Sequence, residues 1–274
     1  MSDFFASPNV QMALVAGGVV GALSAAIGYF VVLRGLSFAG HALTDIGLTG
    51  AAGALLVGIA PLWGLIAFSL GAALAIGALG ERARERDLGT GLVLAVALGI
   101  GALFLHLQTH AANTQNVLLF GSIFETDGGT LRTVAIIGTV ALVALGALFR
   151  PLLFASISEG AARGVGVPVR LIGFAFLSIV ALAVAETAKI VGVLIATALL
   201  IGPPATALAF VRRPLMGIAF AIALGIAEAW LSIGLAYASF GWSSGRQGWP
   251  VSFFVAALAL GALLLTRTLR TSRT

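Results

Sequence analysis

A histidine and an aspartate stand four residues apart, at His41 and Asp45, within the segment GHALTDIGLTG (40–50). Residues at positions i and i+4 of a helix point the same way, so a helix here would present an imidazole and a carboxylate together. Imidazole suits zinc and iron, and carboxylate also suits manganese. The pair therefore predicts either part of a divalent-metal site or a structural contact in which the two side chains satisfy each other or a neighbouring helix.

The pair belongs to a wider polar arc of the same predicted helix. At 100° per residue, Ser37, His41, Thr44, Asp45 and Thr49 fall within about 140°. A charged side chain at the centre of a membrane costs about 2.5–3.5 kcal/mol on insertion scales. We therefore expect Asp45 to face protein or water, with Thr44 and Thr49 as candidates to line a pathway beside it. A two-fold dimer with this helix near its axis would present two imidazoles and two carboxylates, enough for four ligands.

The composition places this helix in a membrane. Of 274 residues, 60% are hydrophobic and 9% are charged, whereas soluble domains carry about 25% charged residues. Apolar runs of about 18 or more residues cross a bilayer as helices, whereas the strands of a barrel would alternate. The absence of cysteine excludes disulfides, thiolate metal sites and thiol catalysis. The sequence therefore predicts an all-α polytopic membrane protein, with residues 1–274 forming one transmembrane domain.

The apolar runs predict about nine crossings. They cover residues 10–33, 38–60, 62–80, 88–105, 131–149, 169–186, 189–211, 214–238 and 250–266. Residues 106–130 are too polar to span and are predicted to form a partly helical element on the outer side. With the N-terminus outside, all of the fifteen basic residues except Arg132, Lys189 and Arg246 fall on the inner side. This charge pattern predicts an N-out, C-in topology and argues against a nucleic-acid surface.

Other polar residues fall in or near the predicted crossings. Glu228 lies in the eighth crossing, where it would either line a pathway or pair with a neighbour. Glu186 and Lys189 are predicted to form a local salt bridge at the outer hairpin. His106 and His110 are again four residues apart, on the outer side. They are candidates to relay a metal from a delivering protein. The favoured interpretation is that both are solvent-exposed surface histidines without such a role.

The segment SISEGAARGVGVPV (156–169) falls on the inner side by the charge count. Ser158 could cap a short helix, and Glu159 would be favourable at its N-terminus. Gly164 and Gly166 would end this helix. The segment therefore predicts a short cytoplasmic helix that could dock in a cleft on a partner, with an ordinary loop as the alternative. The chain carries no G-x-x-x-x-G-K-[ST] motif to cradle phosphates, so any ATP hydrolysis must come from a separate subunit.

Five segments resemble, in order, the permease subunits of the bacterial ABC importers for zinc and manganese. They are VVLRGLSFAGHALTDIGLTGA (31–51), NVLLFGSIF (116–124), SISEGAARGVGVPV (156–169), KIVGVLIATALLIGPPATA (189–207) and YASFGWSSGRQGWP (237–250). The first resembles the family's pattern of an Arg, a Ser-Phe/Tyr pair and Gly-Asp-x-Leu-x-His. The family's Asp falls on His41 and its His falls on Asp45, so the two ligand types are kept with their order exchanged.

The resemblance implies a type II (BtuC-like) ABC importer permease in the bacterial inner membrane, which is a transport subunit and not an enzyme. His41 and Asp45 are implied as metal ligands, with zinc, manganese or iron as the transported substrate and no permanently bound cofactor. The implied partners are a second copy of the chain, a cytoplasmic ATP-binding subunit, an extracytoplasmic metal-binding protein and the lipid bilayer. The implied ATPase-coupling residues are Ser158, Glu159, Ala162, Arg163 and Gly164.

Two other interpretations stay open. A permease for chelated iron or a cobalamin-like cofactor has a related fold and a similar coupling segment, but it needs a wide cavity without metal ligands, so Asp45 would be unexplained. A secondary metal carrier driven by an ion gradient would need no ATPase, so residues 156–168 would have no coupling function. Co-purification with an ATPase subunit separates these interpretations. A membrane enzyme has little support, because no nucleophile–base arrangement or H-E-x-x-H motif is present.

Overall fold

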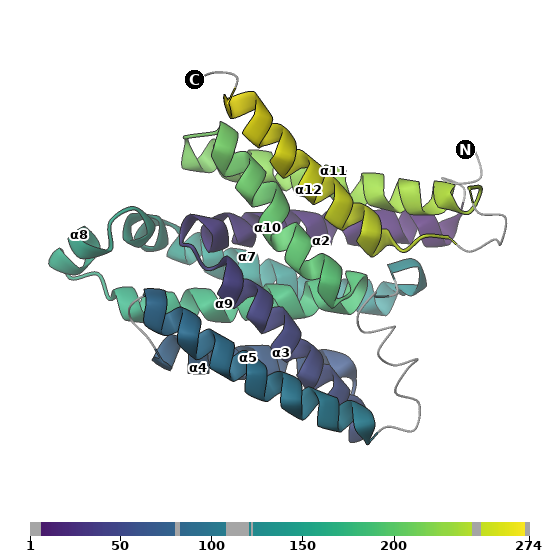
Figure 1. Cartoon of the computed structure of the whole chain (residues 1–274), viewed down its shortest axis with the longest axis horizontal. Helices are drawn as coiled ribbons and strands as arrows, with labels where there is room; N and C mark the ends of the chain where they lie inside the picture. Colours follow the sequence, from purple (N-terminus) through teal and green to yellow (C-terminus); the bar gives the residue numbers. More distant parts are fainter. Residues whose placement is uncertain (1–6, 80–82, 108–120, 122, 243–247, 272–274) are drawn as a thin grey trace.

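The computed structural model describes residues 7–79, 83–107, 121, 123–242 and 248–271, and every regular element in these residues is helical (Figure 1). The long helices are α2 (Pro8–Leu33), α3 (Ser37–Leu56), α4 (Pro61–Leu79), α5 (Ala83–His106), α7 (Gly128–Ile157), α9 (Val169–Val191), α10 (Val193–Phe210), α11 (Pro214–Ser239) and α12 (Val251–Thr271). The short ones are the 3-10 turn η1 (Ile123–Glu125) and α8 (Glu159–Gly164). Six helices, α2, α4, α5, α7, α9 and α11, are long and apolar enough to cross a membrane. The all-α prediction is confirmed.

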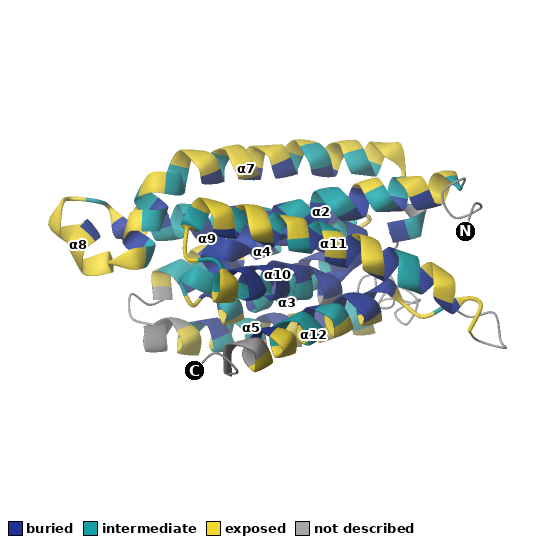
Figure 2. Cartoon of the chain, turned by 90° about the horizontal axis from the view of Figure 1, so that it is seen from above, coloured by how far each residue is buried: buried dark blue, intermediate teal, exposed yellow. Residues whose placement is uncertain are grey.

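Helices α2 and α9 form the centre of the bundle. α2 packs against α9, α10 and α11, while α9 also packs against α4 and α7. Between α2 and α9, the buried rings of Phe30 and Phe176 meet edge to face with their centroids 6.2 Å apart. α7 lies at one edge of the bundle with much of its surface exposed (Figure 2). Its exposed side chains include Ile136, Val140 and Val143. A helix that is apolar on its exposed face as well as its packed face suits a lipid surround.

Glycines allow the closest approaches between helices. Gly21 of α2 faces Gly225 of α11, and Gly50 of α3 faces Gly64 of α4. At each of these positions a Cβ would overlap a backbone carbonyl oxygen of the facing helix. Small residues at a crossing let two backbones pack directly, which is how membrane helices associate without a hydrophobic driving force between them.

Two of the helices extend well beyond the crossings predicted for them. α7 continues through Pro151 to Ile157 and does not end at residue 149. Proline removes one helical hydrogen bond and crowds the preceding turn, so a helix commonly ends before it. The turns beyond Pro151 are instead held by packing, because Leu152 and Ala155 are both buried.

The joint between α9 and α10 also lies later than predicted. Polar Glu186 suggested that the sixth crossing ends at that residue, but α9 runs to Val191 and α10 starts at Val193. Gly192 forms the whole joint, with φ 86° and ψ 160°. Its N–H donates to the carbonyl of Ala188, and its carbonyl accepts from the N–H of Ala196. Glu186 therefore lies inside a helix and not at a hairpin.

The predicted short helix at residues 159–164 is confirmed. The Ser158 hydroxyl accepts a hydrogen bond from the Ala161 N–H at 3.3 Å, as an N-cap should. α8 ends at Gly164, and Gly166, with φ 82°, follows it. Figure 1 shows that α8 projects from one end of the bundle, beyond the ends of the long helices.

Candidate metal site

Helix α3 is buried along most of its length except for one stripe. Between residues 37 and 52, the positions that are not buried are Ser37, Phe38, His41, Asp45 and Leu48. Residues four apart share one face of a helix, so Ser37, His41 and Asp45 form a continuous polar stripe. These three residues, called the α3 stripe below, form the polar part of the face of α3 that is not buried.

The predicted pair stands in the middle of the α3 stripe. The His41 Nε2 atom lies 3.5 Å from Oδ2 of Asp45, and the two side chains are 45% and 22% exposed. The other ring nitrogen, Nδ1, lies 3.2 Å from Oγ1 of Thr197 on α10. One imidazole is thus held between a hydroxyl on α10 and a carboxylate on its own helix. Sequence reasoning missed Thr197, although it carries the only polar side chain between Lys189 and Gly202.

The spacing of the pair suits a shared metal ion. Two ligands each about 2.1 Å from a metal, at a tetrahedral angle, lie about 3.4 Å apart. The observed separation of 3.5 Å is close to this value. Among the residues that the structure describes, no group of three or more His, Cys, Asp or Glu side chains could hold a metal ion. Within the described residues, this site therefore offers two potential ligand atoms, an imidazole nitrogen and a carboxylate oxygen.

The other two members of the predicted arc are used inside the protein. The Thr44 hydroxyl donates to the carbonyl of Gly40 at 3.0 Å, and the Thr49 hydroxyl donates to the carbonyl of Ala97 on α5 at 2.9 Å. Both side chains are buried. Helix α5 packs over Thr49, and the Thr44 hydroxyl is bonded to its own helix, so the pathway that we propose below includes neither residue.

Glu228 lies apart from the α3 stripe, within α11. Its side chain is enclosed, with the residue 6% exposed, and its Oε2 is 3.9 Å from where a Cβ of Gly202 on α10 would stand. Gly202 also meets Ala259 of α12, which closes the space from that side. Neither carboxyl oxygen of Glu228 has a hydrogen-bond partner among the described residues. The structure thus gives this acid neither an open lining position nor a partner.

Glu186 is also enclosed, and its predicted salt bridge with Lys189 is wrong. The residue is fully buried, and neither carboxyl oxygen has a hydrogen-bond partner in the described part of the chain. Its Oε2 lies 3.1 Å from where a Cβ of Gly138 on α7 would stand. Glu186 points into the bundle toward α7, whereas Lys189 is only partly buried.

Lys189 interacts electrostatically with Asp127, the N-cap residue of α7. The Asp127 Oδ1 atom accepts a hydrogen bond from the Thr130 N–H at 2.8 Å. Hydrogen bonding with Thr130 holds the pKa of Asp127 below its usual range, and the positive charge of Lys189 lowers it further.

The outer histidines and the coupling residues are placed only in part. His106 is the exposed last residue of α5, whereas His110 lies outside the described residues. On α8, Arg163 and Glu159 form an exposed ion pair at 2.7 Å. Ala162 points inward, where it is buried in a small cluster with Ala155 and Val169 at the ends of α7 and α9. Ala162 therefore anchors α8 to the bundle and does not face outward.

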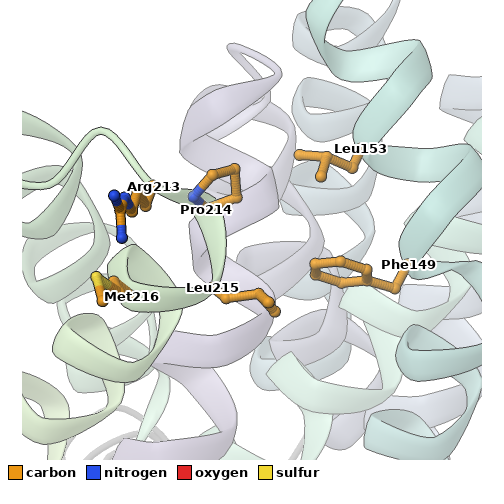
Figure 3. Close-up of a pocket in the computed structure, with 6 residues that line it drawn as sticks. All are labelled: Phe149, Leu153, Arg213, Pro214, Leu215 and Met216. Carbon is orange, nitrogen blue, oxygen red and sulfur yellow. The ribbon is translucent and has the colours of Figure 1, made fainter.

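A groove of about 400 Å³ lies between the end of α7 and the start of α11 (Figure 3). The residues that line it are Phe149, Leu153, Arg213, Pro214, Leu215 and Met216. It offers one positive charge and otherwise apolar groups, without a carboxylate or an imidazole. A divalent cation finds no suitable ligand there, so the groove is separate from the candidate metal site.

Comparisons with known proteins agree with this architecture. The family described as "ABC 3 transport family" matches residues 6–265. The manganese transport system membrane protein MntC of Halalkalibacterium halodurans is 27% identical, over 80% of this chain and 76% of the relative. The manganese import system permease protein ScaB of Streptococcus gordonii is 26% identical, over 90% of this chain and 91% of the relative. A Haemophilus influenzae protein named "Probable iron transport system membrane protein" is 28% identical, over 91% of this chain and 93% of the relative.

Solved structures share the fold. PsaBC from Streptococcus pneumoniae, in complex with Fab, superposes with a TM-score of 0.83 at 24% identity, over 97% of this chain and 94% of that chain. A structure titled "An inward-facing conformation of a putative metal-chelate type ABC transporter" superposes with a TM-score of 0.76 at 18% identity, over 94% of this chain and 85% of that chain. Because the family match spans nearly the whole sequence, this multi-pass membrane chain belongs to the ABC 3 transport family and is a metal ABC transporter permease.

Proposed function

We propose that this chain is the transmembrane permease of an ATP-driven importer for divalent metal ions, with manganese as the first candidate cargo. The observation that carries the proposal is the α3 stripe, in which His41 and Asp45 stand 3.5 Å apart and remain accessible. The names of the relatives MntC and ScaB support manganese. Iron is the second candidate, because one relative is named for iron transport and because imidazole suits iron.

A second copy of the chain would complete the site. Two α3 stripes facing each other across a two-fold axis would supply two imidazole nitrogens and two carboxylate oxygens. The two carboxylates would offset the charge of a divalent cation, and all four groups would replace water from its hydration shell. The ligands must also be weak enough to release the ion on the other side. Alternating access would expose the same site first outward and then inward.

The topology that we propose has nine crossings, with the N-terminus outside and the C-terminus inside. Each predicted crossing overlaps one of the long helices, and the distribution of basic residues favours this orientation. The cytoplasmic ATP-binding subunit would then meet α8, whose exposed face carries Glu159, Arg163 and Gly164. An extracytoplasmic metal-binding protein would deliver the ion from the opposite side. No part of this chain would catalyse covalent chemistry.

The α3 stripe also separates this proposal from the two alternatives. A permease for a metal chelate does not need an imidazole and a carboxylate at ligand distance from each other. A secondary carrier would not need α8, which is capped and anchored to the bundle by Ala162. Isolation of the chain with an ATP-binding subunit would exclude the carrier.

The proposal is tested by manganese uptake in cells that carry this importer as their only manganese importer. Asp45→Asn keeps the shape of the side chain and removes its charge, so we expect uptake to be abolished while the protein still inserts. Asp127→Asn is the matched control, because Asp127 is an exposed helix cap away from the α3 stripe. Wild-type uptake by Asp45→Asn would refute the site. Competition by zinc and by ferrous iron in the same assay would rank the cargoes.

A further inference from the structure

The first half of α10 lies between a break at Gly192 and two prolines inside the continuous helix. At its start, Gly192 has φ 86° and ψ 160°, a conformation that is essentially restricted to glycine. At its end, Pro203 and Pro204 have no N–H groups, so the carbonyls four residues earlier lose their helical donors. Residues 193–202 therefore lie between two points at which helical hydrogen bonding is weakened, and we call them the α10 half-helix.

The α10 half-helix is packed on one side and open on the other. Ile195 and Leu199 are buried in a cluster that includes Ala16 and Val20 of α2. Ala196 is buried in a cluster with Ala51 of α3. The two residues between these contacts, Thr197 and Ala198, are only half-buried. The half-helix therefore lies directly against α3 and presents Thr197 at the level of the α3 stripe.

We propose that Thr197 is the positioning residue of the metal site, an inference that rests on the proposed function. Its hydroxyl, 3.2 Å from Nδ1 of His41, can accept the Nδ1–H, which leaves the lone pair of Nε2 for a metal. Nε2 is also the nitrogen that faces Asp45, at 3.5 Å. A metal-ligating histidine needs such a partner on its other nitrogen to fix its tautomer and the orientation of its ring. The geometry thus assigns Nε2 of His41 as the metal-binding atom.

The place of Thr197 on the α10 half-helix links metal binding to movement. A tilt of residues 193–202 about Gly192 and the two prolines would carry the Thr197 hydroxyl away from α3. The imidazole would then lose the contact that directs Nε2 toward Asp45. One helix movement would therefore convert a pair of aligned ligands into two separate groups, which is what release of the ion requires.

The positioning role is tested by the kinetics of manganese uptake in cells with the complete importer. Thr197→Val removes the hydroxyl and keeps the shape, and we expect KM to rise about 10- to 100-fold, the usual cost of losing such a second partner. Thr197→Ser keeps the hydroxyl and should restore a KM near that of the wild type. Thr206→Val is the matched control on the same helix, because the buried Thr206 hydroxyl has no hydrogen-bond partner among the described residues.

A His41→Ala variant distinguishes the failure of this inference from the failure of the proposed function. Uptake by His41→Ala at the wild-type level would refute the metal site itself. An inactive His41→Ala together with a wild-type KM for Thr197→Val would overturn only the role of Thr197. If Thr197→Val does not accumulate in the membrane, Thr197→Cys carries the same test: a KM clearly above that of Thr197→Ser supports the inference, and an equal KM overturns it.

The linkage to movement has its own kinetic signature. Replacing Pro203 and Pro204 together by alanine restores two backbone donors and should stiffen α10. We expect a loss of maximal uptake rate with an unchanged KM, the opposite of the effect of Thr197→Val. An unchanged maximal rate would show that the two prolines play no part in transport.

Discussion

Asp45 and the two interior glutamates are acids in the same helical bundle, yet their surroundings are opposite. Asp45 is 22% exposed in its side chain and has an imidazole nitrogen at 3.5 Å. Glu186 and Glu228 are enclosed, and none of their carboxyl oxygens has a hydrogen-bond partner among the described residues. A buried polar group without a partner costs about 1–3 kcal/mol. Access and a neighbouring imidazole, more than the presence of an acid, are the reasons for proposing the α3 stripe as the metal site.

The largest effects should come from exchanging ligands within the α3 stripe. His41→Asp and Asp45→His should each abolish manganese uptake. Two close carboxylates repel each other and tend to hold a proton, whereas two imidazoles lose the anion that offsets the cation. The double exchange, His41→Asp with Asp45→His, restores both ligand types and should retain measurable uptake. All variants are compared at matched membrane expression.

A double mutant as inactive as the single mutants would contradict the view that one imidazole and one carboxylate are enough. It would mean that each ligand depends on a fixed neighbour, as the contact between His41 and Thr197 suggests for the imidazole. A changed preference between zinc and manganese in the double mutant would show that the order of the ligands tunes selectivity.

A second prediction tests access directly, because the chain contains no cysteine. Single cysteines at positions 45, 186 and 228 would each be the only thiol. A charged, water-soluble thiol reagent should label Asp45→Cys and leave Glu186→Cys and Glu228→Cys unlabelled in the folded protein. All three should be labelled after denaturation. Rapid labelling at position 228 in the folded protein would place Glu228 on a water-filled path. It would then not differ from Asp45 in its access to water.

The smallest effect on transport should come from the enclosed acids. Glu228→Gln and Glu186→Gln should retain uptake near the wild-type level, because neither acid reaches the α3 stripe in this conformation. Glu228→Met should raise the free energy of unfolding by about 1–3 kcal/mol, since it removes a carboxyl group that has no partner. Thermal unfolding of the purified variants measures the second effect. Loss of uptake in either glutamine variant would give the enclosed acid a role in transport.

Much of the fold was predictable, because membrane helices follow from long apolar runs. The cap at Ser158 and the glycines after it also predicted α8, since capping depends on local sequence. The helical periodicity placed Thr44 and Thr49 on the same arc as Asp45, but it could not show that both would be buried or that α5 would pack over Thr49. Glu186 was misplaced because a polar residue was taken to end a helix. Thr197 was missed because its role depends on α10 lying against α3, a contact between residues 156 positions apart.

The central claim is tested most directly by manganese binding to the purified importer in lipid nanodiscs. Electron paramagnetic resonance reports free manganese, so titration gives both affinity and stoichiometry. We predict one manganese ion at this site for every two copies of the permease, no such binding in Asp45→Asn or His41→Ala, and unchanged binding in Asp127→Asn. Binding by Asp45→Asn with the affinity and stoichiometry of the wild type would contradict the account.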